Sequence, residues 1–421
     1  MVQEISNIMR TKAIYLLLVL IAIVCSCGGR GQAERVADES SDDSAQAAYV
    51  MEGKMSGEHI VARNIIFRTD RTDIVIPDSV TSIDSHAYYG YSRLTNIEIP
   101  NSVTSIGGYA FKDCSQLTHI RLPRSLTSIN DGTFSNCNRL AAIEIPASVT
   151  SIGEVAFSYC NSLTNIEIPN SVTSIGFCAF IDCISLTTIK IPNSVTSIGN
   201  AAFSGCTNLA TIEISASVTN IGYGTFKDCP GLTHVKIPNS VTSIGPLAFS
   251  DCSNLTSIEI PNSVTYIGDR IFHNCISLTS IELPPSIIRI GRGAFEGCTS
   301  LDSIIIPPSV TSIGRGAFKD CSSLVNIKIP NSLTSVGSAV FKGCFNLKTV
   351  EVFWPEPVST YYASDNDDGD HEEEFSDWEA SGYTWGDGEV IPATLYVPKG
   401  TKELYAQDEE WSRFSSILER D

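Results

Sequence analysis

Apolar residues recur along this chain with a period of 23 positions from residue 77 to about residue 352. Counted from a proline, which Ser215 replaces in one unit, the consensus reads P-x-S-V-T-S-I-G-x-x-A-F-x-x-C-x-x-L-T-x-I-x-I, and twelve units follow one another without insertion or deletion. Ser at the third place and Leu at the eighteenth place never vary. Because one inserted residue would shift every later unit, this constant length predicts a solenoid of stacked turns, in which each unit contacts its neighbours.

The apolar spacing divides each unit into three segments. The segment L-T-x-I-x-I ends at the proline and predicts a short strand, since β-branched residues favour strands and proline cannot donate to a ladder. The segment S-V-T-S-I-G predicts a second extended stretch, closed by a glycine such as Gly107 or Gly153 at positive φ. In A-F-x-x-C-x-x-L, spacings of three and four predict a helical turn or 3₁₀ segment. We therefore predict an α/β-type repeat solenoid with a parallel β-sheet on one face.

The repeat resembles a known family. The spacing L-x-x-I-x-I followed by an invariant small polar residue is similar to the leucine-rich repeat. The fuller pattern IPNSVTSIGxxAFxxCxxLTxIxIP resembles the BspA-like branch of that family over residues 77 to about 352. This resemblance implies an exported bacterial surface protein that binds host or neighbouring-cell macromolecules, such as a protein or extracellular-matrix ligand, and several members are adhesins. It does not imply which ligand is bound.

The two ends of the repeat array depart from the pattern, because a solenoid exposes an apolar cross-section at each end and needs caps. Residues 58–76 are expected to form the N-terminal cap. In the first unit, Tyr88, Tyr91 and Asp84 replace the usual Phe, Cys and Gly, which we interpret as half-exposed positions.

After the last unit we expect an acidic insertion over residues 353–390 and a C-terminal cap over residues 391–421. The cap sequence resembles the closing strand and helix of the family, with the helix starting at Gly400-Thr401. The side chains expected to cover the last unit are Val397, Leu404, Tyr405, Trp411, Phe414 and Ile417.

The first 27 residues predict an export signal. Arg10 and Lys12 precede an apolar run, 13–24, that is too short to span a bilayer as a mature helix. The run ends in Val-Cys-Ser-Cys, which resembles a bacterial lipoprotein signal with lipidation at Cys27; the alternative is an ordinary secretory signal that leaves Cys27 as a free thiol. Residues 28–57 are small, polar and charged, and predict a flexible tether. We expect an exported lipoprotein, anchored by its lipid at the outer membrane or cell surface.

The 14 cysteines first suggest disulfides or metal sites, but most share one register. Two lie in the export signal, one is Cys178, and eleven occupy the fifteenth place of the units: Cys114, Cys137, Cys160, Cys183, Cys206, Cys229, Cys252, Cys275, Cys298, Cys321 and Cys344. No C-x-x-C spacing for a metal occurs among them, and stacked side chains that point the same way do not form disulfides. We predict a row of buried free thiols, next to a buried row of Phe at the twelfth place.

Charge and motifs argue against nucleic-acid binding and against catalysis. The net charge is -19, whereas nucleic acid requires a basic footprint; residues 352–421 hold 18 Asp and Glu against 4 Lys and Arg, which accounts for -14. H-E-x-x-H, G-x-S-x-G and phosphate-binding glycine loops are absent from the sequence, and no cofactor is expected. The acidic stretch 364–379 is out of phase with an EF-hand, so we expect an acidic insertion rather than a calcium site.

The strand segment leaves two rows of side chains facing away from the core, at the twentieth and twenty-second places, and we call these rows the strand face. The twenty-second place holds Glu98, Arg121, Glu144, Glu167, Lys190, Glu213, Lys236, Glu259, Glu282, Ile305, Lys328 and Glu351, and the twentieth includes His119 and His234. Opposite charges on adjacent strands are close enough to pair. The strand face is either a solubilising surface or a protein-binding surface for an extended or repetitive ligand. A structural or periplasmic scaffold without a host ligand is the alternative function, and a monomer is expected.

Overall fold

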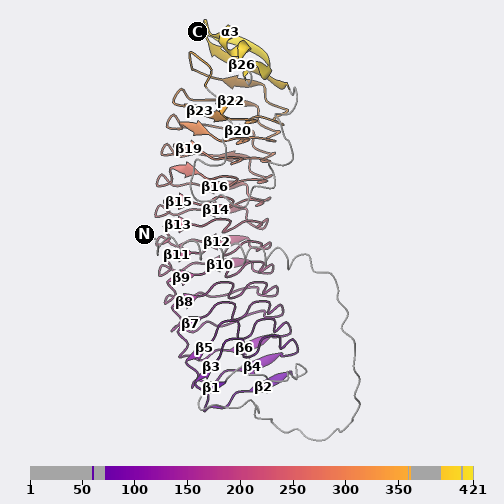
Figure 1. The fold of residues 1–421 in the computed structure, drawn as a ribbon, viewed down its shortest axis with the longest axis vertical. Coiled ribbons are helices and arrows are strands. Elements are labelled where there is room, and N and C mark those ends of the chain that lie inside the picture. The colour runs from indigo at the N-terminus through magenta and orange to yellow at the C-terminus, as the bar shows by residue number, and fades with distance from the viewer. Residues whose placement is uncertain (1–58, 61–71, 359, 362–389, 409–410, 421) are drawn as a thin grey trace, which may run out of the picture. The chain divides into compact units, whose positions relative to one another are not determined.

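The computed structural model describes residues 59–60, 72–358, 360–361, 390–408 and 411–420. The predicted export signal with Cys27, the tether, most of the N-terminal cap and the acidic stretch 364–379 lie outside the described residues. Between residues 72 and 358 the chain is a parallel β-solenoid, and each unit contributes one turn (Figure 1). Strand partners are offset by one unit, as in the pairing of Thr188 with Thr211. The predicted repeat solenoid is therefore confirmed.

Two rows of short strands run along the stack. The first row of strands carries the strand face. It consists of β2 (Asp73–Val75), β4 (Asn96–Glu98), β6 (His119–Arg121), β10 (Thr188–Lys190), β12 (Thr211–Glu213), β14 (His234–Lys236), β16 (Ser257–Glu259), β18 (Ser280–Ile281), β20 (Ser303–Ile304), β22 (Asn326–Lys328), β24 (Thr349–Glu351), β26 (Ile391–Pro398) and β27 (Phe414–Arg420). The second row consists of β1 (His59–Ile60), β3 (Ser82–Ile83), β5 (Ser105–Ile106), β7 (Ser128–Ile129), β8 (Ser151–Ile152), β9 (Ser174–Ile175), β11 (Ser197–Ile198), β13 (Asn220–Ile221), β15 (Ser243–Ile244), β17 (Tyr266–Ile267), β19 (Arg289–Ile290), β21 (Ser312–Ile313), β23 (Ser335–Gly337) and β25 (Thr360–Tyr361).

The third side of each turn is not the helical turn that the spacing predicted. Within residues 72–358 this side contains hydrogen-bonded turns and no helix. In every unit the residues at the tenth and fourteenth places have φ between 48° and 76°, and this left-handed conformation interrupts a right-handed helix. Amide groups at the tenth, twelfth and fourteenth places instead donate to carbonyls of the next turn, as Phe226 N does to Ala248 O at 2.9 Å.

The glycine at the eighth place has a different role from the predicted one. Gly107, Gly153 and Gly199 do not have positive φ. A Cβ atom on Gly199 would lie 2.5 Å from both the carbonyl carbon of Gly176 and the amide nitrogen of Phe177, in the preceding turn. Glycine therefore stands here because successive backbones approach too closely for a side chain. Asn130 occupies this place where the preceding turn has two successive glycines, Gly107 and Gly108.

The close approach at the eighth place predicts a large difference between two glycines of the same register. Gly199→Ala is expected to lower the free energy of unfolding by about 1–3 kcal/mol, because backbone must move to admit the methyl group. Gly268→Ala is the matched control, since its nearest contacts would be 3.2 and 3.3 Å away. Urea titrations followed by circular dichroism measure both, and equal losses would contradict the steric explanation.

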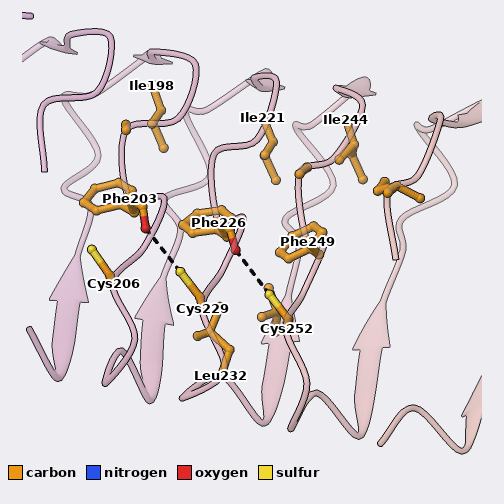
Figure 2. Packing of buried hydrophobic residues seen from close by; sticks show 14 of the residues in the cluster. Ile198, Phe203, Cys206, Ile221, Phe226, Cys229, Leu232, Ile244, Phe249 and Cys252 are labelled. Atoms are coloured by element: carbon orange, nitrogen blue, oxygen red, sulfur yellow. Dashed lines mark hydrogen bonds between the residues drawn. The ribbon is translucent and has the colours of Figure 1, made fainter. Parts of the chain in front are cut away.

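Stacked aromatic rings form the centre of the core. The eleven Phe of the twelfth place are buried, and neighbouring rings stack with centroids 5.3 to 6.2 Å apart. Figure 2 shows Phe203, Phe226 and Phe249 between the isoleucine and cysteine rows of the same turns. The expectation that Tyr88 and Tyr91 are half-exposed is wrong: they are 0% and 5% exposed, and Tyr88 stacks on Phe111 at 5.0 Å. The ring stack therefore continues through the first unit.

The cysteine row is a hydrogen-bonded ladder of free thiols. All eleven are buried and unbridged, as predicted. Each Sγ donates to the backbone carbonyl of the twelfth-place residue in the preceding turn, at 3.1 to 3.2 Å, and Figure 2 shows two of these bonds, from Cys229 to Phe203 and from Cys252 to Phe226. Burial raises the thiol pKa, to about 12 for Cys160. The thiols link adjacent turns while remaining protonated at neutral pH.

The invariant serine of the third place joins neighbouring turns in seven units, whereas the buried hydroxyls of Ser102, Ser194 and Ser240 have no hydrogen-bond partner among the described residues. Ser125 Oγ donates to Val103 O, and Ser286 Oγ donates to Val264 O, each at 2.7 Å. The acceptor is in both cases the fourth-place carbonyl of the preceding unit. Where this bond forms, a side-chain hydroxyl satisfies a backbone carbonyl that the tight corner leaves without a ladder partner.

The C-terminal cap closes the stack with a strand, a short helix and a second strand. Strand β26 pairs with β24, helix α3 (Lys402–Gln407) begins after Thr401 as predicted, and η1 (Trp411–Arg413) leads into β27 (Figure 1). Val397, Tyr405, Trp411 and Phe414 are buried and Ile417 packs partly buried against the core, but Leu404 is 46% exposed and does not cover the last unit.

The structure also places the start of the predicted acidic insertion against the solenoid. Trp354 and Val358 are buried. Their carbonyls accept hydrogen bonds from Tyr405 Oη at 3.0 Å and Trp411 Nε1 at 3.3 Å, and β25 pairs with β23. The boundary at residue 353 is therefore too early, because residues 353–358 and 360–361 form part of a further turn that the repeat pattern does not mark.

Candidate binding face

The strand face presents two exposed rows of polar side chains separated by a buried row. In β4, β6, β10, β14, β16 and β22 the middle residue is buried and the two outer residues are exposed. The predicted face residues are exposed: Glu98, Arg121, Glu144, Glu167, Lys190, Glu213, Lys236, Glu259, Glu282, Lys328, His119 and His234. Glu144, Glu167 and Glu282 hold the same place in their units but lie outside the strands, and Glu351 is half-buried. The alternation follows from strand geometry, in which successive side chains point to opposite sides.

Opposite charges in the outer row form ion pairs between adjacent strands. Lys190 Nζ lies 3.2 Å from Glu213, and Lys236 Nζ lies 3.7 Å from Glu259. These side chains are more than 60% exposed, so each pair contributes less than about 1 kcal/mol and can exchange its partner for a ligand group. The predicted pairing across strands is confirmed.

The inner row offers hydrogen-bonding groups, and the structure does not bring its two histidines together. His119 Nδ1 lies 3.0 Å from Thr118 Oγ1, whereas His234 Nδ1 lies 2.9 Å from Ser257 Oγ. They are on β6 and β14, five turns apart, so they cannot act on one reacting group. The face is suited to contacts spread along its length.

The end of the face contains residues that the repeat pattern could not indicate. Register pairing places Tyr396 beside Glu351 and Leu418 beside Tyr396, which continues the outer row into the cap. Burial opposes ionisation of Glu351, but hydrogen bonds from Arg420 at 2.6 Å and from Lys328 lower its pKa below the ordinary value. Ile305 is 82% exposed in the same row. The strand face thus carries both acidic and basic side chains along its length, with apolar side chains near its C-terminal end.

Two further features are missing from the residues that the structure describes. Within these ranges, no three His, Cys, Asp or Glu side chains converge to hold a metal ion. The described part of the chain also contains no helix that is both long and apolar enough to cross a membrane.

The stacked 23-residue turns, with a parallel strand face and an invariant leucine, define a leucine-rich repeat protein. The chain belongs to the BspA-type leucine-rich repeat family: six copies of the family model are found, and matches span residues 61–180, 129–256 and 244–360. A search of curated proteins gave no match.

Solved structures of bacterial leucine-rich repeat proteins are similar to this chain. A leucine-rich repeat protein from Bacteroides ovatus is 28% identical, with a TM-score of 0.53, over 76% of this chain and 95% of that chain. A leucine-rich cell surface protein from Faecalibacterium prausnitzii is 37% identical, with a TM-score of 0.48, over 66% of this chain and 78% of that chain. A leucine-rich repeat protein from Eubacterium ventriosum is 24% identical, with a TM-score of 0.46, over 66% of this chain and 84% of that chain.

Proposed function

We propose that this protein is an exported lipoprotein, attached through Cys27, that binds host or neighbouring-cell macromolecules through the strand face. The exposed polar rows, which run through successive turns in one register, carry the proposal, because a solenoid offers such a surface to extended partners. Its similarity to a cell surface protein is consistent with display outside the cell. Binding without catalysis fits a face whose histidines lie far apart and whose charges are exposed.

Charge reversal on the strand face tests this proposal. The triple variant Lys190→Glu, Lys236→Glu, Lys328→Glu is expected to change affinity for the bound ligand about tenfold or more, because it removes three cations and creates like-charge neighbours. Immobilised collagen, laminin and fibronectin serve as probes, with binding measured by biolayer interferometry. The matched control is Lys112→Glu, Lys227→Glu, Lys342→Glu, which reverses three charges at the thirteenth place on another side.

The outcome separates a binding face from a solubilising one. Unchanged binding by the strand-face variant, with an unaltered melting temperature, would contradict the proposal. If none of the probes binds, surface labelling of intact cells decides between a displayed adhesin and the periplasmic scaffold, because a scaffold is protected from the reagent. An unlabelled protein on intact cells that becomes labelled after lysis would support the scaffold.

A further inference from the structure

Arginine is distributed very unevenly along the solenoid. No arginine occurs between Arg139 and Arg270, and then four follow within three successive units: Arg270, Arg289, Arg292 and Arg315. They occupy the sixth, ninth and tenth places, so they lie on β19 and the adjoining turn side and not on the strand face. We call these four residues the arginine cluster.

The stacking of turns brings the cluster together. Arg270 N donates to Arg292 O at 2.8 Å, and Gly293 N donates to Arg315 O at 2.9 Å, so the three turns are hydrogen-bonded to one another at this point. The Cγ of Arg270 would lie 3.2 Å from a Cβ on Gly293, which shows that its side chain extends over the next turn. Arg292 and Arg315 share the ninth place, and adjacent strands in such a stack are about 4.8 Å apart.

Part of the arginine cluster is accessible to a ligand. Arg289 and Arg315 are exposed, whereas Arg270 and Arg292 are half-buried. The Arg289 guanidinium lies 5.5 Å from the centroid of the Tyr266 ring, an arrangement that orients the group through a cation–π contact. One guanidinium group of the cluster is therefore oriented by an aromatic ring.

Positive charge exceeds negative charge around the cluster. The nearby carboxylates are Asp269, Glu296 and Asp320. Asp269 accepts from Tyr266 Oη at 2.8 Å and from the Arg292 amide at 2.7 Å, while Lys319 Nζ lies 2.6 Å from Glu296 and 3.6 Å from Asp320. These turns thus hold four arginines and Lys319 against three carboxylates, two of which are paired with Lys319. This excess stands out in a protein whose net charge is -19.

We propose that the arginine cluster is a second binding surface, separate from the strand face, for a sulfated polysaccharide. Guanidinium groups bind two oxygens of a carboxylate or of a tetrahedral phosphate through two parallel hydrogen bonds, and a sulfate ester offers the same tetrahedral set of oxygens. Cations on consecutive turns match anions repeated along a linear polymer. The aromatic ring here, Tyr266, is in contact with Arg289 and is not a stacking platform for nucleotide bases. Sulfate groups repeated along a glycan match cations on consecutive turns, and this binding requires no base stacking.

Heparin is the probe for this proposal, with the full chain as the protein. We expect binding at about 50 mM salt that weakens steeply towards about 500 mM, because salt screens exposed charges. The variant Arg289→Gln, Arg292→Gln, Arg315→Gln is expected to bind at least tenfold more weakly. Replacing the same residues by Lys keeps the charge but removes the planar fork, so an intermediate loss is expected.

The matched control removes three cations from the strand face instead. Lys190→Gln, Lys236→Gln, Lys328→Gln is expected to change heparin affinity less than twofold. Equal weakening by the two triple variants, or no heparin binding at about 50 mM salt, would overturn the proposal. Comparable binding of single-stranded DNA or poly-glutamate at matched charge would overturn the assignment to sulfated glycans. Because Arg315 is exposed, the single variant Arg315→Gln keeps the test valid if the triple variant does not fold.

Discussion

The protein is expected to lose its fold abruptly between pH of about 9 and 10. Twelve thiols are buried in the described structure, and burial raises their pKa, to about 12 for Cys206 and Cys252. In the unfolded chain a thiol ionises near pH 8.5. Above that pH the unfolded state releases protons that the folded state retains, so the free energy of unfolding falls as pH rises.

The size of this effect follows from the number of thiols. Each contributes about 1.4 kcal/mol of stability per pH unit above the unfolded pKa, so twelve together account for roughly 16 kcal/mol per unit, as much as the whole stability of an ordinary domain. Below about pH 8 the contribution is fully present. Circular dichroism across a pH series, in a reducing buffer, measures the loss.

Thiol-deleted variants separate this cause from general alkaline damage. Cys229→Ala with Cys252→Ala is expected to reduce the slope of stability against pH by about 2.8 kcal/mol per unit, although it also lowers stability at neutral pH. Tyr88 and Tyr405 also have raised pKa values through burial, but tyrosine in an unfolded chain titrates near 10, at the upper end of the interval measured, so the thiols act at lower pH than the tyrosines. A free energy of unfolding that is the same at pH 7 and pH 10 would contradict the prediction.

Phe226→Ala is expected to lower the free energy of unfolding by about 3–5 kcal/mol. The ring is fully buried, and its centroid lies 5.8 Å from that of Phe203 and 5.5 Å from that of Phe249. Alanine would leave a cavity in the middle of the stack, bounded by two turns whose register prevents them from closing on it. Urea titration measures the loss, and hydrogen exchange locates it, with the largest increase expected in the turns on either side.

The chain offers a matched control for this substitution. Phe345, at the sixteenth place, is 68% exposed, so Phe345→Ala is expected to change stability by less than about 0.5 kcal/mol. Similar losses for the two variants would show that the ring stack does not hold the core together. A loss confined to the local turns would show that the array unfolds in parts, as repeat proteins can.

The strand face was predictable to a large extent from the repeat. Places twenty and twenty-two alternate with buried isoleucine, which assigns Lys190 and Glu213 to one exposed surface and makes them neighbours one turn apart. The end of the face was not predictable. Tyr396, Leu418 and Arg420 lie outside the period, and only strand pairing brings them beside Glu351.

The sequence by itself determined the period, the rows and the inward or outward direction of each strand residue, because every unit meets a copy of itself and one register defines all contacts. The tertiary structure decided three features that the 23-residue period does not indicate. Gly199 is required by the approach of the backbone of the preceding turn, a distance that no spacing reveals. The left-handed residues of the third side interrupt a helix, and amides of this side donate to carbonyls of the next turn instead. The arginine cluster exists only in three dimensions, since its members hold different places in neighbouring units and come together when the turns stack.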